Sequence, residues 1–195
     1  MNDSERKQQD RFQALRLQRF YLAQSTYMIA YVVIAVTWAT GHYLGSNAMA
    51  LSHYALGFIT QFTFFLIFKT GLNLRFRDPS LTSPQIIVAL LLQTYLLALV
   101  GEIRGTIMVA YCLILLFGVF QMSRTAYLIH AALALVCYAS LIVINQYLGI
   151  YPQSLTVALL EWFILACFLL WLIILGSYIR ALRERLQQRH STLQQ

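Results

Sequence analysis

The segment that decides the fold is LTVALLEWFILACFLLWLIILGSY, Leu155–Tyr178, in which Glu161 is the only charged residue. About 20 consecutive apolar residues are enough for a helix to cross the hydrocarbon core of a bilayer. Runs of similar length and character precede it at Tyr21–Tyr43, Met49–Phe68, Pro84–Val100, Gly105–Met122 and Tyr127–Tyr147. The sequence therefore predicts an all-α integral membrane protein, a bundle of six transmembrane helices.

The composition agrees with this class. The chain of 195 residues is 59% hydrophobic and 11% charged, whereas a soluble domain has about 25% charged residues. The first apolar run is too long for the core of a cleaved signal peptide, and no small-residue cleavage site follows it. The cysteines, Cys112, Cys137 and Cys167, lie inside apolar runs without paired spacing. This pattern indicates packing residues rather than a disulfide framework or a metal site.

The basic residues predict the orientation. All of the 14 Lys and Arg residues except Arg104 fall in segments that six spans would place on one side. The positive-inside rule then puts both termini in the cytoplasm. The net charge of +7 reflects this topology and contact with anionic lipid headgroups, and it does not imply nucleic acid as a partner.

We expect three parts: a basic interfacial arm over residues 1–20, the transmembrane domain over 21–178, and a cytoplasmic helix over 179–195. An alternating three-and-four spacing of apolar residues, typical of a coiled coil between two copies, begins inside the last span and continues into this helix. Its members in the tail are Ile179, Leu182, Leu186 and Leu193. A frayed helix end is the alternative, because a confident coiled-coil assignment needs three to four heptads.

The connection between the second and third runs contains two helix-start patterns, Asp78-Pro79 and Ser83-Pro84. In each, a capping side chain precedes a proline whose missing N–H costs nothing in the first turn. We expect the third span to start at Ser83, and Arg75 and Arg77 to lie at headgroup level.

Polar residues concentrate toward the outer ends of the predicted spans, opposite the termini. Glu161 lies six residues into its span, about 9 Å deep at 1.5 Å per residue, where a charge needs a partner, water or a proton. Arg104 is the only basic residue on that side and is the candidate partner of Glu161 or Glu102. We expect an outward-opening pocket in which Arg104 and Glu161 face a small ligand. The ligand-binding candidates are Glu161, Arg104, Glu102, Asn145, Tyr95, Trp162, Trp38, His42 and His53.

Simpler interpretations stand beside this one. Glu102 and Arg104 can cap a tight outer turn, while the Trp and Tyr residues form an interfacial belt. His42 and His53, from adjacent helix ends, can ligate haem b or a metal, although most histidines at such positions are polar interfacial residues. The chain has no Gly-rich phosphate loop, no His-Glu metal pair and no elbow serine, so we predict no catalytic residues.

Two stretches resemble a known family. The segment GLNLRFRDPSLTSPQ, Gly71–Gln85, resembles the connector after the second helix in the six-helix membrane input regions of bacterial GGDEF diguanylate cyclases. The segment SYIRALRERLQQRHSTLQQ, Ser177–Gln195, resembles the signalling helix that leads into the catalytic domain. The resemblance implies a homodimeric sensor in the bacterial inner membrane, whose coil sets the geometry of two downstream domains that make cyclic di-GMP. These residues hold no GGDEF motif, so cyclase activity is not carried over and a downstream signalling domain is expected.

The sequence therefore favours a membrane sensory module that detects a small ligand from the outer side and signals through its last helix. Two alternatives remain: a membrane haem or redox protein, and a small transporter. A transporter typically has polar residues through the whole membrane depth and helix breaks near the midplane. In this chain the polar residues of the predicted spans are concentrated on one side.

Overall fold

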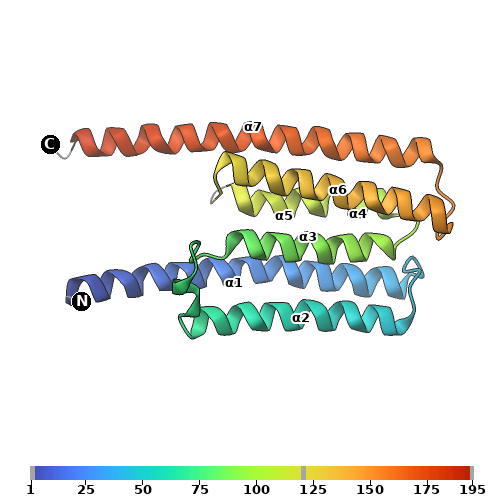
Figure 1. The fold of residues 1–195 in the computed structure, drawn as a ribbon, viewed down its shortest axis with the longest axis horizontal. Helices are drawn as coiled ribbons and strands as arrows, with labels where there is room; N and C mark the ends of the chain where they lie inside the picture. Colours follow the sequence, from blue (N-terminus) through green and yellow to red (C-terminus); the bar gives the residue numbers. More distant parts are fainter. Residues whose placement is uncertain (1–2, 120–121, 194–195) are drawn as a thin grey trace.

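The computed structural model describes residues 3–119 and 122–193, which fold as helices without a strand. The elements are α1 Asp3–Ala39, α2 Asn47–Lys69, the 3₁₀ turn η1 Leu72–Arg75, α3 Thr82–Ala98, α4 Arg104–Ile107, α5 Ala110–Val119, α6 Arg124–Leu148 and α7 Leu155–Leu193. They lie side by side in an elongated bundle, and both termini lie at the same end (Figure 1). The predicted all-α class is confirmed for the described residues.

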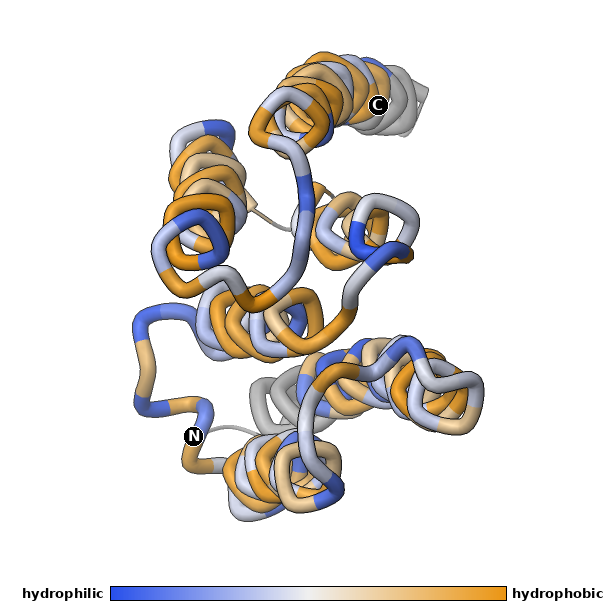
Figure 2. The backbone as a smooth tube through the Cα atoms, turned by 90° about the vertical axis from the view of Figure 1, so that its right-hand side faces the viewer, coloured by the Kyte–Doolittle hydropathy of each residue, from blue (hydrophilic) through white to orange (hydrophobic). Residues whose placement is uncertain are grey.

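Four helical segments are long and apolar enough to cross a membrane. They are Arg11–Ala39, Asn47–Lys69, Arg124–Leu148 and Leu155–Leu182. Two further apolar stretches, Thr82–Ala98 and Arg104–Val119, are shorter. Viewed along the helices, hydrophobic residues cover outward as well as inward faces (Figure 2), as expected of helices surrounded by lipid. The chain is therefore a membrane protein with four candidate spans, and six spans remain a prediction.

Helix α3 lies at the centre of the packing. It contacts α2 on one side and α5 and α6 on the other, while α7 covers α5 and α6. Leu90, Leu97, Tyr111, Leu115 and Leu165, from α3, α5 and α7, are completely buried in this core. Helix α1 packs mainly on α2, so the α1–α2 hairpin is attached to the other helices chiefly through α3.

The long end helices run without interruption. Helix α1 extends from Asp3 to Ala39 and α7 from Leu155 to Leu193, and each projects past the other helices at the end with the termini (Figure 1). The basic arm expected over residues 1–20 therefore leads into the first span within one continuous helix.

The connection before α3 differs in detail from the prediction. Helix α3 starts at Thr82, and the Asp78 carboxylate accepts hydrogen bonds from Ser80 N and Thr82 N, both at 3.0 Å. Ser83 does not cap this helix, because its Oγ is hydrogen-bonded to His130 Nε2 on α6 at 2.9 Å. Asp78 therefore makes the hydrogen bonds at the start of α3, and Ser83 joins α3 to α6.

The fourth predicted span, Gly105–Met122, is broken. Helix α4 ends at Ile107 and α5 begins at Ala110. Gln93 Nε2 of α3 donates a hydrogen bond of 3.0 Å to Ile107 O at the break. An amide from the neighbouring helix thus satisfies a carbonyl at the interruption, which is how broken helices are tolerated at membrane depth.

Candidate functional site

The Glu161 carboxylate is the centre of the candidate site. Tyr138 Oη on α6 donates to Glu161 Oε2 at 2.6 Å, and Gln153 Nε2, in the loop between α6 and α7, donates to the same oxygen at 2.9 Å. A bond as short as 2.6 Å is typical of a hydroxyl donating to a carboxylate. Two donors from two different elements therefore hold Glu161, a side chain that is partly buried.

Helix α4 closes the other side of the carboxylate. A Cβ atom built on Gly105 would overlap Glu161 Oε1. A side chain at position 105 would force the Glu161 carboxylate to move from its present position. Gly105 therefore belongs to the site, which is assembled from α4, α6, α7 and the loop before α7.

Arg104 does not form the ion pair that the sequence suggested. Its side chain is 3% exposed, and its Nε donates to Leu97 O, in the last turn of α3, at 2.9 Å. Within the described residues no salt bridge joins Arg104 to Glu161 or Glu102. A cation at the C-terminal carbonyls of a helix is favourable, so Arg104 ties α4 to α3 directly beside Gly105.

Two further candidates bond to backbone groups of α6 and of the α6–α7 loop. Trp162 Nε1 donates to Leu135 O at 3.0 Å. Asn145 is buried, donates to Tyr151 O at 2.9 Å and accepts from Tyr151 N at 3.0 Å. Trp162 therefore joins α7 to α6, and Asn145 positions the α6–α7 loop that carries Gln153.

The remaining candidates lie on α1, α2, α3 and the loops between helices. Their contacts are separate from the Glu161 site. The rings of Tyr95 and His53 stack with centroids 4.9 Å apart, and Glu102 is exposed. Trp38 Nε1 donates to Asn47 Oδ1 at 3.0 Å, and His42 Nδ1 is hydrogen-bonded to Thr40 Oγ1 at 3.0 Å. The described residues contain no cluster of three or more His, Cys, Asp or Glu side chains able to hold a metal ion. The structure gives His42 and His53 different partners.

Sequence reasoning missed three members of the site, Gln153, Gly105 and Tyr138. Gln153 is a loop glutamine and Gly105 a glycine in the short helix α4, and neither stands out in a single sequence. Tyr138 is one of many outer tyrosines, so its donor role could not be chosen from its position. The available signal was the depth of Glu161, which requires a partner without naming it.

The apolar stripe of α7 faces two environments. Leu172 is buried, and Leu175 and Ile179 pack against the core of the same chain. Leu182 is 46% exposed, and the side chains of Leu186 and Leu193 lie outside the described part. The stripe therefore packs inside its own bundle as far as Ile179, whereas Leu182 is exposed enough to contact a second copy.

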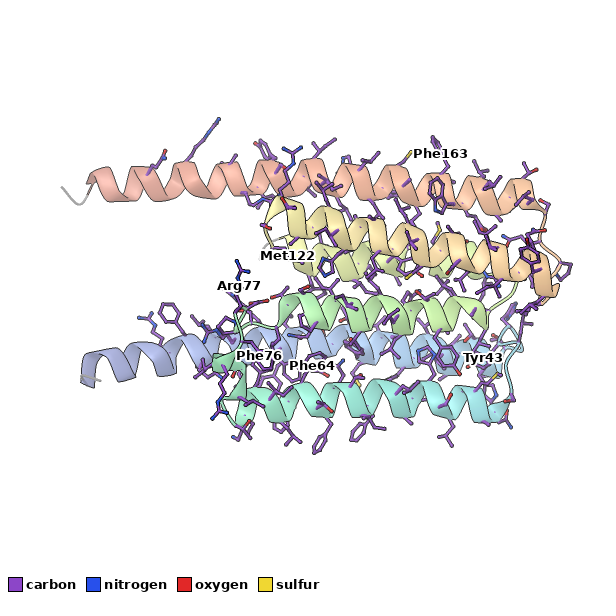
Figure 3. All side chains as sticks on the ribbon, viewed as in Figure 1. Tyr43, Phe64, Phe76, Arg77, Met122 and Phe163 are labelled. Atoms are coloured by element: carbon purple, nitrogen blue, oxygen red, sulfur yellow. The ribbon has the colours of Figure 1, made fainter. Side chains whose placement is uncertain are left out.

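Helix α7 leaves the bundle beside the link between α5 and α6. Arg180 Nη1 donates to Met122 O at 2.7 Å, and Met122 is seen at this link in Figure 3. One turn earlier, a Cβ built on Gly176 would lie 2.9 Å from Val119 Cγ1 of α5. These contacts hold α7 close to α5 at the point where α7 leaves the bundle.

Comparison of the chain with protein-family models, with characterised proteins and with solved structures finds no match.

Proposed function

We propose that the chain is the sensory input part of a membrane signalling protein. A small ligand binds at Glu161 from the outer side, and α7 transmits the change to a downstream output such as a diguanylate cyclase. The observation that carries the proposal is the continuity of α7, 39 residues without a break. This single helix joins Glu161 to the tail that projects at the opposite end of the bundle (Figure 1).

The proposal includes six spans with both termini in the cytoplasm of a bacterium. Two termini at one end of the bundle agree with an even number of crossings, and the basic residues gather at that end. Helix α3 and the α4–α5 pair are the short spans, and a bilayer adapts to short spans by local thinning at modest cost.

Gln153 is the donor that a ligand would replace. Tyr138 lies on α6, whereas Gln153 belongs to the loop before α7 and can move with less disturbance of the bundle. A ligand that carries a positive charge or N–H donors would take the place of Gln153 on the carboxylate. Release of Gln153 frees the start of α7 from its loop, which is the change that α7 would carry inward.

Transmission then depends on the other end of α7. Arg180 and Gly176 hold the helix against α5 where it leaves the bundle. We propose that two copies meet through the stripe from Leu182 onward, since the earlier members of the stripe pack against their own bundle. A rotation or shift of α7 would change how the two tails pair.

The test is a fusion of residues 1–195 to the catalytic domain of a diguanylate cyclase, with cyclic di-GMP measured in cells. Glu161→Gln should change the output about fivefold or more. Glu102→Gln, an exposed carboxylate at the same end of the bundle, is the matched control and should leave it unchanged. One alanine inserted after Tyr178 turns the tail by about 100° and should also change the output. A folded Glu161→Gln fusion with unaltered output would contradict the proposal.

A small transporter is the second candidate, because the helix is interrupted between α4 and α5. Interrupted helices often form transport sites. Here Gln93 occupies the break, and the break lies near the outer end. Uptake of a cationic solute into proteoliposomes, lost in Gln93→Leu and retained in Glu102→Gln, would favour this candidate over the sensor.

A further inference from the structure

A groove separates α1 from α3 and α5 at the end of the bundle that carries the termini. The empty space in and over this groove, including the part that is open to its surroundings, is about 620 Å³. Arg16, Arg19 and Ala23 line it from α1, Ala89 from α3 and Phe117 from α5. Because α1 packs mainly on α2, this groove is a gap between the α1–α2 hairpin and the remaining helices.

The lining changes character along the groove. Arg16 and Arg19, three residues apart on one face of α1, lie at the end nearest the terminus, at the same level as Ser80 before α3. The deeper lining includes Ala23, Ala89 and Ile114. One end of the groove is therefore cationic and the other mostly apolar.

The length of the groove matches one leaflet. Its lining on α1 runs from Arg16 to Tyr27, which is about 16 Å at 1.5 Å per residue. Half of a hydrocarbon core of about 30 Å is about 15 Å. A molecule whose charge lies at the Arg16 end can therefore extend one chain along the groove to the middle of the membrane.

The charge at the mouth is not balanced by this part of the protein. The described lining of the groove contains neither Asp nor Glu, and Arg16 Nη1 donates to the neutral amide oxygen of Gln13 at 3.3 Å. Guanidinium groups bind phosphate oxygens through paired N–H donors. Two arginines above an apolar groove are complementary to an anion that carries an alkyl chain.

We propose that this groove binds one anionic phospholipid of the inner leaflet. Its phosphate contacts Arg16 and Arg19, its glycerol region lies beside Ser80, and one acyl chain fills the space between α1, α3 and α5. The lipid would serve as the packing partner that α1 lacks on this side. This site is distinct from the Glu161 site, which lies at the other end of the bundle.

The experiment is native mass spectrometry of the full chain in mild detergent, with phosphatidylglycerol and phosphatidylcholine of identical acyl chains added in equal amounts. The wild type should retain one phosphatidylglycerol in preference to phosphatidylcholine. Arg16→Gln/Arg19→Gln should lower its apparent affinity about tenfold. The matched control is Arg75→Gln/Arg77→Gln, which removes the same charge from the connector at the same end (Figure 3) but outside the groove, and it should keep the lipid.

A second variant separates the groove from surface charge. Ala23→Leu/Ala89→Leu fills the groove and keeps every arginine, so it should also lose the lipid. Helicity by circular dichroism checks that each variant is folded. Independently of any variant, dihexanoyl phosphatidylglycerol should bind the wild type about tenfold more weakly than the long-chain lipid, since it cannot fill the groove. Equal binding of both headgroups, equal loss in both arginine pairs, retention in the filled groove, or equal binding of short and long chains would each overturn the proposal.

Discussion

A single carboxylate shows how strongly one residue constrains this protein. A charged residue in the middle of a transmembrane helix costs about 2.5–3.5 kcal/mol on insertion scales. Glu161 offsets part of such a cost through the hydrogen bonds from Tyr138 and Gln153, and the small size of Gly105 lets α4 approach it. The site therefore depends on few atoms, and removal of one donor has a measurable effect.

Tyr138→Phe removes the shorter of the two hydrogen bonds to Glu161 and keeps the ring. We expect the free energy of unfolding to fall by about 1.5–3 kcal/mol, the usual contribution of a hydrogen bond to a charged group. Thermal unfolding in detergent measures the change. Tyr147→Phe, on the same helix but 86% exposed, is the control and should shift stability by less than about 0.5 kcal/mol. Equal effects of the two changes would show that Tyr138 does not support the carboxylate.

At the scale of the element, side chains from neighbouring helices donate hydrogen bonds to backbone carbonyls where a helix is interrupted or two helices are linked. The interruption between α4 and α5 is bridged by Gln93 from α3, and α7 is held by Arg180 where it leaves the bundle. In an apolar environment a carbonyl without a donor is costly. Gln93 and Arg180 are therefore the polar side chains that we expect to matter most for the shape of the bundle.

Gln93→Leu leaves Ile107 O without its donor from α3. The expected loss is about 1–3 kcal/mol of unfolding free energy, the penalty for an unsatisfied buried acceptor. The same thermal measurement applies, with Gln18→Leu as a control, because Gln18 is exposed on α1. Unchanged stability of Gln93→Leu would mean that α4 and α5 rearrange to satisfy the carbonyl internally.

Arg180→Leu removes the hydrogen bond from α7 to Met122 O. Backbone amides of α7 after residue 180 should then exchange with deuterium about tenfold faster, because local opening becomes easier. Hydrogen exchange read by mass spectrometry gives the rates. Arg185→Leu, which removes the same charge from an exposed position on the same helix, should leave exchange near residue 180 unaltered. If both variants exchange alike, the Met122 contact does not hold the exit of α7.

At the scale of the whole molecule, the arrangement separates two ends with different chemistry. The Glu161 site lies at the end opposite the termini, while the groove with Arg16 and Arg19 lies at the end that carries them. Helix α7 connects these ends directly, whereas α1 follows the same course mainly in contact with α2. The two ends lie on opposite sides of a bilayer only if α3 and the α4–α5 pair both cross the membrane.

That topology predicts opposite labelling of two loops. In a parent chain whose cysteines are replaced by serine, Glu102→Cys should react with a membrane-impermeant maleimide on intact cells. Arg77→Cys should react only after the membrane is opened. Both positions are exposed, and they flank α3, so reaction of both on the same side would show that α3 does not cross.

Some features could be predicted from particular residues. The length of the apolar run Leu155–Tyr178 and its counterparts was enough to predict a helical membrane protein, because hydrocarbon thickness sets helix length independently of packing. The depth of Glu161 along its own run marked it as a residue that needs a partner, because that depth depends only on the rise per residue. These inferences are local, and neighbouring helices do not alter them.

The partners were decided by the tertiary structure. Tyr138 and Gln153 reach Glu161 because of the rotation and depth of α6 and its loop, and Arg104 turned to Leu97 because the end of α3 lies beside it. The stripe of α7 has the same spacing whether it meets its own bundle or a second copy, so its period did not reveal that Ile179 packs inside. Periodicity places a residue on a face of a helix, but only the positions of the other helices determine what that face contacts.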